Sequence, residues 1–376
     1  MTQDLYVGLM SGTSVDSIDA ALIELDQRGG TSRLLHHHSA AIDSGTRADI
    51  LALCQSGTAE IERMGELDRK LGHLFASACL QLLDSAHISA SQIKAIGSHG
   101  QTIRHRPPTR SRAPERAFTC QIGDPNTIAE LTGITTVADF RRRDIAAGGQ
   151  AAPLVPCFHQ AAFSATDCNR LIVNIGGMAN VTVLEGKHLV AGYDTGPGNV
   201  LLDGWIHQHR GEHYDNGGRW AAAGEVNNSL LEIFLQHSYF QLPPPKSTGR
   251  ETFNLPWLKQ QLAKCASPSP QDVQATLLEL SARSICQSLN HLKTQAQELY
   301  VCGGGAHNTK LMQRIATLMA PVPVNTTATL GIAPDWVEAS AFAWLASQTL
   351  KGRSGSSPLV TGAQGERILG GIYHAG

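Results

Sequence analysis

Apolar runs that end in glycine-rich turns open both halves of the chain. Short apolar segments bounded by Gly, Ser and Asp are typical of strands. The first half predicts three successive strands, at 5–9, 18–25 and 33–42. The second half repeats the order, with strands at 171–175 and 181–184 and a third that leads to Tyr193. Two domains of similar construction are therefore expected.

Longer segments with apolar residues at helical spacing follow each set of strands. They predict helices at 46–55, 59–85, 125 onward, 198–209, 225–236, 254–263, 271–293, 308 onward and 335–350. Asp124 and Pro125 suit an N-cap and a first helical position. Further strands are expected at 92–98, 135–138, 298–302 and 368–373, and the Arg- and Pro-rich segment 104–116 is expected to be an exposed loop.

The pattern predicts two α/β domains that face each other across a cleft. We expect the first at 1–139 and the second at 140–364, with the tail 365–376 packing on the first. A length of 376 residues is too great for one ordinary core and suits two.

Composition excludes several classes of protein. A formal net charge of −2 creates no long-range field for nucleic acid or an anionic membrane. The sequence contains neither a run of 18 apolar residues nor the start of a signal peptide. The 8 cysteines form no C-x-x-C pair, which argues against a zinc ribbon. We expect a cytoplasmic enzyme.

Three glycine-rich turns follow apolar strands, at 11–14, 194–199 and 303–305. Neither a G-x-x-x-x-G-K-[ST] loop nor a G-x-G-x-x-G turn after a strand occurs. Turns of Gly, Ser and Thr nevertheless offer N–H groups and hydroxyls to phosphate oxygens. Any one of them could be only a tight hairpin, but three in one chain favour a nucleotide site.

Acidic residues beside these turns are candidates for catalysis and metal binding. Asp194, at a strand end, could accept a proton from an attacking hydroxyl or water, or could simply cap the helix that follows. Asp16 or Asp19 could hold Mg²⁺ through water, although carboxylates are equally common in surface turns.

Polar residues elsewhere are candidates for substrate binding. One or two arginines of the run 141–143 could grip a carboxylate, or the run could be solvated. His99 and Gln101 could bind sugar hydroxyls or only satisfy their turn. The loop 246–251 could approach a ligand, and Glu338 could face the cleft. The 16 histidines lack H-E-x-x-H spacing, so we predict no metal site built from protein ligands alone.

Taken together, these motifs resemble those of the anhydro-N-acetylmuramic acid kinases of bacterial cell-wall recycling. The carrying segments are GLMSGTSVDSIDAAL (8–22), GSHGQTIRH (97–105), QIGDPNTIAELTGI (121–134), VADFRRRDIAAGGQAAPLVP (137–156), NIGGMANV (174–181), YDTGPGNVLLDGW (193–205), PKSTGRETFNLPWL (245–258), QATLLELSARSI (274–285) and VCGGGAHN (301–308). Ser17 departs from the glycine that the family usually has after its first Asp.

The resemblance implies an actin/hexokinase-like (ribonuclease H-like) fold with a nucleotide and sugar cleft. It also implies that ATP, with Mg²⁺, phosphorylates O6 of 1,6-anhydro-N-acetylmuramic acid while water opens the anhydro bridge. Asp194 would then activate the water, and Arg142 or Arg143, His99, Gln101 and Glu338 would contact the sugar. The implied ATP-binding residues are Gly8, Leu9, Met10, Ser11, Gly12, Thr13, Ser14, Val15, Gly196, Gly198, Gly303, Gly304 and Gly305. A homodimer is a family-level expectation.

Two other functions are compatible with the same fold. One is a kinase that transfers phosphate to a simple hydroxyl or carboxylate and needs no water-activating aspartate. The other is an actin- or Hsp70-like ATPase that switches a partner interaction. The sequence lacks the separate peptide-binding domain that an Hsp70 would add.

Overall fold

The chain forms two compact units in the computed structural model, which describes residues 3–26, 32–109, 112–265, 268–289, 292 and 295–376. One unit comprises 1–163 together with 336–376, and the other comprises 164–335. These limits differ from the expected boundaries after 139 and 364. The difference arises because the helix Arg142–Ala146 packs on the strand Phe118–Ile122 of the first unit and the helix Pro156–Phe163 packs on the helix Val337–Leu350. The helix Val337–Leu350 in turn packs on the first sheet.

The first unit is built on a six-stranded sheet with the order β13-β7-β4-β1-β2-β3 in the described residues. Its strands are β1 (Asp4–Met10), β2 (Ser17–Leu25), β3 (Ser32–Ala41), β4 (Ile93–Ser98), β7 (Thr136–Ala138) and β13 (Gly371–Tyr373). Strands β1, β2 and β3 are antiparallel neighbours, whereas β4 is parallel to β1 and β7 is parallel to β4.

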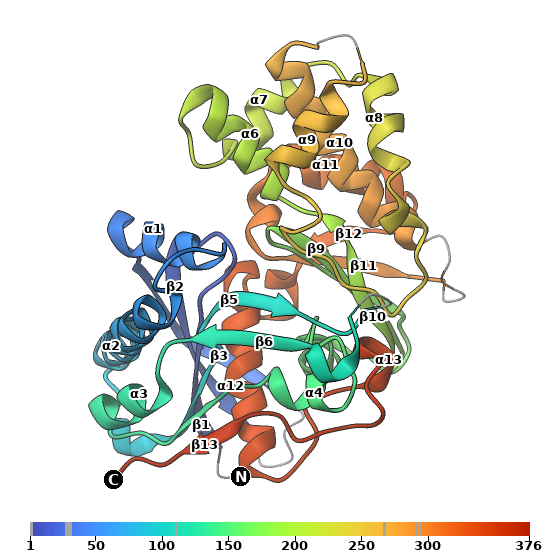
Figure 1. Cartoon of the computed structure of the whole chain (residues 1–376). Coiled ribbons are helices and arrows are strands. Elements are labelled where there is room, and N and C mark those ends of the chain that lie inside the picture. The colour runs from blue at the N-terminus through green and yellow to red at the C-terminus, as the bar shows by residue number, and fades with distance from the viewer. Residues whose placement is uncertain (1–2, 27–31, 110–111, 266–267, 290–291, 293–294) are drawn as a thin grey trace. The chain divides into compact units, whose positions relative to one another are not determined.

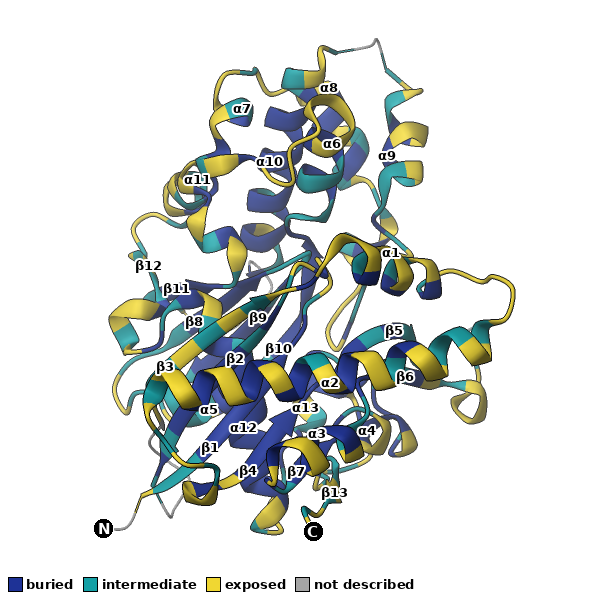
Figure 2. Cartoon of the chain, turned by 90° about the vertical axis from the view of Figure 1, so that its left-hand side faces the viewer, coloured by how far each residue is buried: buried dark blue, intermediate teal, exposed yellow. Residues whose placement is uncertain are grey.

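Helices cover both faces of this sheet. The helices α1 (Ser44–Leu53), α2 (Glu60–Ala86) and α3 (Pro125–Thr132) contribute to the core on the side of Val7 and Leu9. Helix α2 turns a buried face to the strands and an exposed face to solvent (Figure 2). Helix α12 (Val337–Leu350) packs on β1, β2 and β4 from the other side (Figure 1).

Two paired glycines allow α12 to approach the sheet closely. Gly8 of β1 and Gly97 of β4 are register partners. A Cβ on Gly8 would lie 2.8 Å from the Ala339 carbonyl carbon, and one on Gly97 would lie 2.6 Å from the Phe342 carbonyl carbon. Glycine within a strand often marks such an approach of another backbone. Packing therefore accounts for Gly8, which the sequence placed among the ATP-binding residues.

The remaining elements of the first unit are short. They are the hairpin β5 (Gln101–Arg106) and β6 (Phe118–Ile122), the helices α4 (Arg142–Ala146), α5 (Pro156–Phe163) and α13 (Pro358–Thr361), and the 3-10 turns η1 (Ala90–Gln92), η2 (Pro114–Arg116) and η8 (Pro334–Trp336), the last of which crosses the unit boundary. The predicted loop 104–116 is thus partly strand and partly 3-10 turn, and residues 110–111 lie outside the described residues.

The second unit contains a five-stranded sheet with the order β10-β9-β8-β11-β12 in the described residues. Its strands are β8 (Arg170–Ile175), β9 (Met178–Glu185), β10 (His188–Pro197), β11 (Glu298–Cys302) and β12 (Val324–Thr326). Strands β8, β9 and β10 are antiparallel neighbours, and β11 and β12 continue in parallel from β8. Apart from β13, which adds an antiparallel edge strand to β7, the two sheets share one topology, three antiparallel strands followed by two parallel ones. The predicted actin/hexokinase-like fold class is confirmed.

Helices of the second unit enclose a core that includes Phe234, Phe253 and Leu280. They are α6 (Val200–Arg210), α7 (Arg219–Ala222), α8 (Asn228–Leu235), α9 (Leu255–Leu262), α10 (Pro270–Ser288) and α11 (Thr309–Met319), with 3-10 turns η3 (Asn216–Gly218), η4 (Ser238–Gln241), η6 (Gly304–His307) and η7 (Thr327–Leu330). Predicted helix 271–293 ends earlier, at Ser288, and its positions 290–291 and 293 lie outside the described residues.

Candidate active site

Asp194 lies near the end of β10 in a row of polar residues that crosses three strands. It is the register partner of Asn180 in β9, and Asn180 is the partner of Asn174 in β8. Directly opposed residues of antiparallel strands project to the same face of a sheet. Asp194 and Asn174 are buried, with exposed fractions of 6% and 4%. Both asparagines lie in the motif NIGGMANV (174–181), but nothing in the sequence pattern singles them out as site residues.

A loop after α8 holds Asp194 in place. The Thr248 amide donates to Asp194 Oδ2 at 2.9 Å, and the Tyr239 hydroxyl donates to the Asp194 carbonyl at 2.7 Å. The Asp194 amide donates to the Lys246 carbonyl at 3.1 Å. Helix α6 has Asn199 as its N-cap, so the alternative that Asp194 caps this helix is wrong.

The surroundings of Asp194 are buried and polar. Burial, followed by the negative charge of Asp194, raises the pKa of the Tyr239 hydroxyl, which therefore stays protonated as a hydrogen-bond donor. Burial lowers the pKa of Lys246, and Asp194 acts in the opposite direction. Three buried oxygens nearby have no hydrogen-bond partner in the described residues, namely Asn174 Oδ1, Asn180 Oδ1 and Thr248 Oγ1. A polar ligand would satisfy such atoms.

The turn after Asp194 packs against the turn that follows β8. The Gly198 amide donates to the Gly177 carbonyl at 2.9 Å, and the Asn199 amide donates to the Gly176 carbonyl at 2.9 Å. A Cβ on Gly198 would lie 3.2 Å from the Met178 carbonyl carbon, and one on Gly196 would lie 2.8 Å from Phe240 Cε1. Both predicted glycines are thus needed for close packing.

The third glycine turn meets the end of β8 from the opposite side. Gly303 has a φ of +77°, which favours glycine, and its amide donates to the Pro334 carbonyl at 3.0 Å. A Cβ at this position would lie 2.9 Å from the Ile175 carbonyl oxygen. Gly305 is buried against Ile175, whereas Gly304 is exposed. The second unit therefore brings the turns 194–199 and 303–305 together around the end of β8.

The first unit presents the loop 11–16 between β1 and β2. Thr13 and Ser14 are exposed, and a Cβ on Gly12 would meet no atom within 4 Å. Val15 is buried with a φ of +59°, an unusual backbone conformation for a β-branched residue. Leu9 and Met10 are instead buried residues of β1, so only their backbones could face a ligand.

His99 and Gln101 are buried and engaged within the first unit. Ser11 donates to Gln101 Oε1 at 2.7 Å, which ties the loop to β5. Arg141 Nε donates to His99 Nε2 at 2.9 Å, and Arg141 Nη1 donates to the Ala151 carbonyl. Burial, and then the Arg141 charge, lowers the pKa of His99 far below its ordinary value, so this imidazole is neutral.

The arginine run is divided by the start of α4. Arg141 is half-buried and bound to His99, a role that the sequence analysis did not assign to it. Arg142 is exposed and pairs with Asp139 at 3.4 Å, and Arg143 is exposed. Glu338 lies half-buried in the first turn of α12.

The two metal candidates lie on the first hairpin. Asp16 is exposed and pairs with Arg47 at 3.1 Å, whereas Asp19 Oδ1 accepts hydrogen bonds from Ser17 and Ser39. Within the described part of the chain, no three His, Cys, Asp or Glu side chains gather as a metal site. One or two carboxylates together with phosphate oxygens are, however, what Mg²⁺ ordinarily takes in nucleotide sites.

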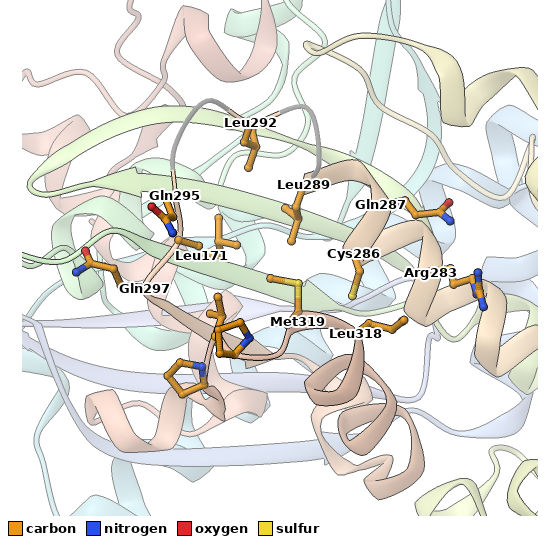
Figure 3. A pocket seen from close by; sticks show the side chains of 14 residues that line it. Leu171, Arg283, Cys286, Gln287, Leu289, Leu292, Gln295, Gln297, Leu318 and Met319 are labelled. Atoms are coloured by element: carbon orange, nitrogen blue, oxygen red, sulfur yellow. The ribbon is translucent and has the colours of Figure 1, made fainter.

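A cavity of about 550 Å³ lies elsewhere in the second unit (Figure 3). Leu171, near the start of β8, and Gln297, which immediately precedes β11, both line it. The glycine turns follow the other ends of these strands. The cavity is therefore separate from the candidate site.

Comparison with known proteins gives the family. The family model described as anhydro-N-acetylmuramic acid kinase matches residues 4–375. The chain belongs to this family. The resemblance seen in the motifs is thereby confirmed over the whole described chain.

Relatives of the family are similar over their full length. The chain is 51% identical over 376 residues to anhydro-N-acetylmuramic acid kinase of Shewanella woodyi, with 100% of each chain covered. It is 52% identical over 374 residues to the enzyme of the same name from Saccharophagus degradans, covering 99% of this chain and 100% of the relative. Both relatives carry the name of a kinase, and the expectation of an enzyme is confirmed.

Solved structures match less closely. (R)-2-hydroxyglutaryl-CoA dehydratase component A of Acidaminococcus fermentans has a TM-score of 0.47 and 11% identity, covering 92% of this chain and 99% of that one. A match at this level carries no functional information. No helix in the described residues is both long and apolar enough to cross a membrane.

Proposed function

We propose that this chain is an ATP-dependent kinase of anhydro-N-acetylmuramic acid. It phosphorylates O6 of the sugar while water opens the 1,6-anhydro bridge, and the products are N-acetylmuramic acid 6-phosphate and ADP. The full-length similarity to kinases of this name supports the substrate. The buried, loop-held carboxylate of Asp194 supports the water attack. The reaction would serve cell-wall recycling in the cytoplasm.

Asp194 is the proposed general base. Water attacks C1 of the sugar and gives a proton to the Asp194 carboxylate, while the bond between C1 and O6 breaks. O6, released from the bridge, attacks the γ-phosphorus of ATP, and ADP leaves. The hydrogen bond from the Thr248 amide fixes one carboxylate oxygen, which orients the base toward its water.

The glycine turns are the proposed holders of ATP. Gly12, Thr13 and Ser14 would receive the γ-phosphate, because this loop exposes small residues and hydroxyls. The turn 303–305 would meet the nucleoside end. Mg²⁺ would neutralise phosphate charge, with Asp16 or Asp19 as a ligand through water. Arg142 or Arg143, His99, Gln101 and Glu338 remain proposed contacts to the sugar.

The test combines the protein, Mg-ATP and 1,6-anhydro-N-acetylmuramic acid in ¹⁸O-labelled water. Mass spectrometry should find the label at C1 of a phosphorylated product. Absence of turnover would exclude this function. A kinase that accepts ordinary sugars and leaves the anhydro bridge intact would indicate the simple-hydroxyl alternative. ATP hydrolysis independent of any sugar would indicate the ATPase switch.

The variant Asp194→Asn separates these functions further. The amide cannot accept the water proton, so bond cleavage and phosphorylation should both fall by about 10²- to 10⁴-fold, the usual contribution of a general base. Product formation followed by mass spectrometry measures both. Phosphorylation that survives while ring opening is lost would contradict the coupling of the two steps.

A further inference from the structure

Asn180 is the residue of β9 that lies directly opposite the proposed base. It is the register partner of Asp194 in the antiparallel pair of β9 and β10. Side chains at opposed positions of such a pair project to one face of the sheet, and their Cβ atoms lie about 4.5–5.5 Å apart. The amide of Asn180 and the carboxylate of Asp194 are therefore neighbours on one face.

A β-bulge follows this pair of residues. Asp194 faces Asn180, whereas the next paired residue of β10 is Gly196, which faces Ala179. The extra residue, Thr195, donates through its hydroxyl to the Ala179 carbonyl at 3.2 Å. Bulges bend the strand and re-aim side chains, and they are frequent next to active sites. The pairing of Asp194 with Asn180 is thus the last regular position before the strand is redirected.

Asn180 brings a second hydrogen-bond acceptor to the side of Asp194. Asn180 Oδ1 is buried and has no hydrogen-bond partner among the described residues. An amide oxygen can only accept hydrogen bonds, and an ionised carboxylate is likewise an acceptor alone, so Asp194 cannot satisfy this oxygen. Because an unpaired buried acceptor costs free energy, Asn180 Oδ1 requires a donor that a bound molecule supplies.

We propose that Asn180 is a further catalytic residue, whose Oδ1 atom is the second acceptor for the attacking water. Water carries two O–H donors on one oxygen, which suits two neighbouring acceptors. One proton points to Asp194, which takes it up, and the other points to Asn180. The two hydrogen bonds together direct a lone pair of the water oxygen toward C1 of the sugar. The inference rests on the proposed function, in which water opens the anhydro bridge.

Two alternatives give the second contact to another group. Thr248 donates through its amide to Asp194 Oδ2 at 2.9 Å, and its hydroxyl oxygen is also buried without a partner among the described residues. A hydroxyl can turn and donate to the ligand, however, whereas the Asn180 oxygen can only accept. A divalent cation could also join two acceptor oxygens. It would occupy the carboxylate that must take up the proton.

The experiment lets methanol compete with water in the full-length wild-type, Asn180→Val and Asn180→Ala proteins. Anhydro-sugar and Mg-ATP react at one fixed, non-denaturing methanol concentration. Mass spectrometry gives the ratio of methyl glycoside 6-phosphate to N-acetylmuramic acid 6-phosphate. The methanol oxygen bonds to C1, its only hydroxyl proton passes to Asp194, and O6 leaves C1 and takes the γ-phosphoryl group. Methanol therefore never uses the second acceptor.

Both variants should slow the attack of water by about 2- to 10-fold, the contribution of one neutral hydrogen bond. The ratio of methyl glycoside to hydrolysis product should rise by at least the same factor, because the reaction of methanol loses no hydrogen bond. A merely structural role of Asn180 would slow both nucleophiles equally and leave the ratio unchanged. Asn325→Val, at an exposed position of β12, is the matched control and should keep the wild-type rate and ratio.

The outcomes separate the inference from the function on which it rests. A ratio that does not rise in the Asn180 variants, whatever their rate, would overturn the role of Asn180. A rise in Thr248→Val without one in the Asn180 variants would assign the second acceptor to the threonine hydroxyl. A raised Mg²⁺ requirement with an unchanged ratio would indicate a cation at this pair. If Asn180→Val fails to fold, Asn180→Ala decides alone. A wild-type protein without turnover of this sugar would instead reject the proposed function.

Discussion

Substitution by alanine should have different effects at two glycines of the same motif, because one glycine is packed under a helix and the other is not. Gly8 and Gly12 both belong to GLMSGTS, but only Gly8 lies under a helix. An alanine Cβ at Gly8 would lie 2.8 Å from both the Ala339 carbonyl carbon and the Ala343 nitrogen. Ordinary contacts begin near 3.4 Å, so α12 or β1 must shift by at least several tenths of an ångström.

The expected cost of Gly8→Ala is that of overpacking a rigid core, about 1–3 kcal/mol. For a unit of about 200 residues, each kcal/mol lowers Tm by about 2–4 °C. Gly12→Ala meets no neighbour within 4 Å and should leave Tm unchanged within about 1–2 °C. If Gly12 faces the γ-phosphate as proposed, its variant should instead raise KM for ATP.

Thermal unfolding and steady-state kinetics with varied ATP measure these two effects separately. Gly97→Ala, which crowds the same helix from β4, serves as a second packing variant and should behave like Gly8→Ala. A Gly8→Ala protein with wild-type Tm and a raised KM for ATP would refute the packing interpretation. It would restore Gly8 to the ligand-binding loop.

Two further predictions concern stability and pH. His159 is fully buried, and burial lowers its pKa to about 3. Its imidazole therefore binds a proton only when the protein unfolds. The free energy of unfolding that is present at pH 7 is consequently lost as pH falls below about 6.5, the ordinary pKa of histidine. His159→Phe should remove about 2 kcal/mol of that loss at pH 5, seen as a smaller Tm difference between pH 7 and pH 5; an unchanged difference would contradict the assignment. Glu279 in the second unit accepts hydrogen bonds from Arg283 and Arg314. Burial raises the pKa of the Glu279 carboxyl group, but the hydrogen bonds and charges of Arg314 and Arg283 outweigh burial, so this pKa is lowered. Glu279→Gln should lower Tm at pH 7 by several degrees. The difference in Tm from wild type should shrink as pH falls below about 4.5, because protonation of Glu279 then removes the ion pairs of the wild-type protein. A constant difference at all pH values would argue against an ionic contribution.

Much of the architecture could be predicted from sequence, because strands, helix caps and helices are determined by residues that are close together in the sequence. The strand–turn–strand openings of both halves, the Asp124 cap and the helix after Asn308 follow from spacing within a few residues. The membership of α12 in the first unit could not be predicted this way, because it depends on contacts between Gly8, Gly97 and a helix far along the chain.

The candidate site likewise contains residues that a local sequence pattern predicts and contacts that it does not predict. Asp194 could be found because it ends a strand in a glycine-rich motif. Its bonds to Tyr239 and Thr248 join residues 45 and 54 positions apart, which no local pattern indicates. The arginine run was also ambiguous, since only the turn before α4 decides that Arg141 reaches His99 while Arg142 stays exposed.

The connectivity of the two units also governs the order in which they can fold during synthesis. Residues 164–335 are inserted between the two segments of the first unit. When this insertion leaves the ribosome, β1 and β4 still lack the helix that covers Gly8 and Gly97, because α12 and β13 are translated last. The second unit has its whole sequence by then and can condense on its own. A nascent chain that stops before 336 therefore exposes one apolar face of the first sheet, which makes the final forty or so residues decisive for escape from aggregation.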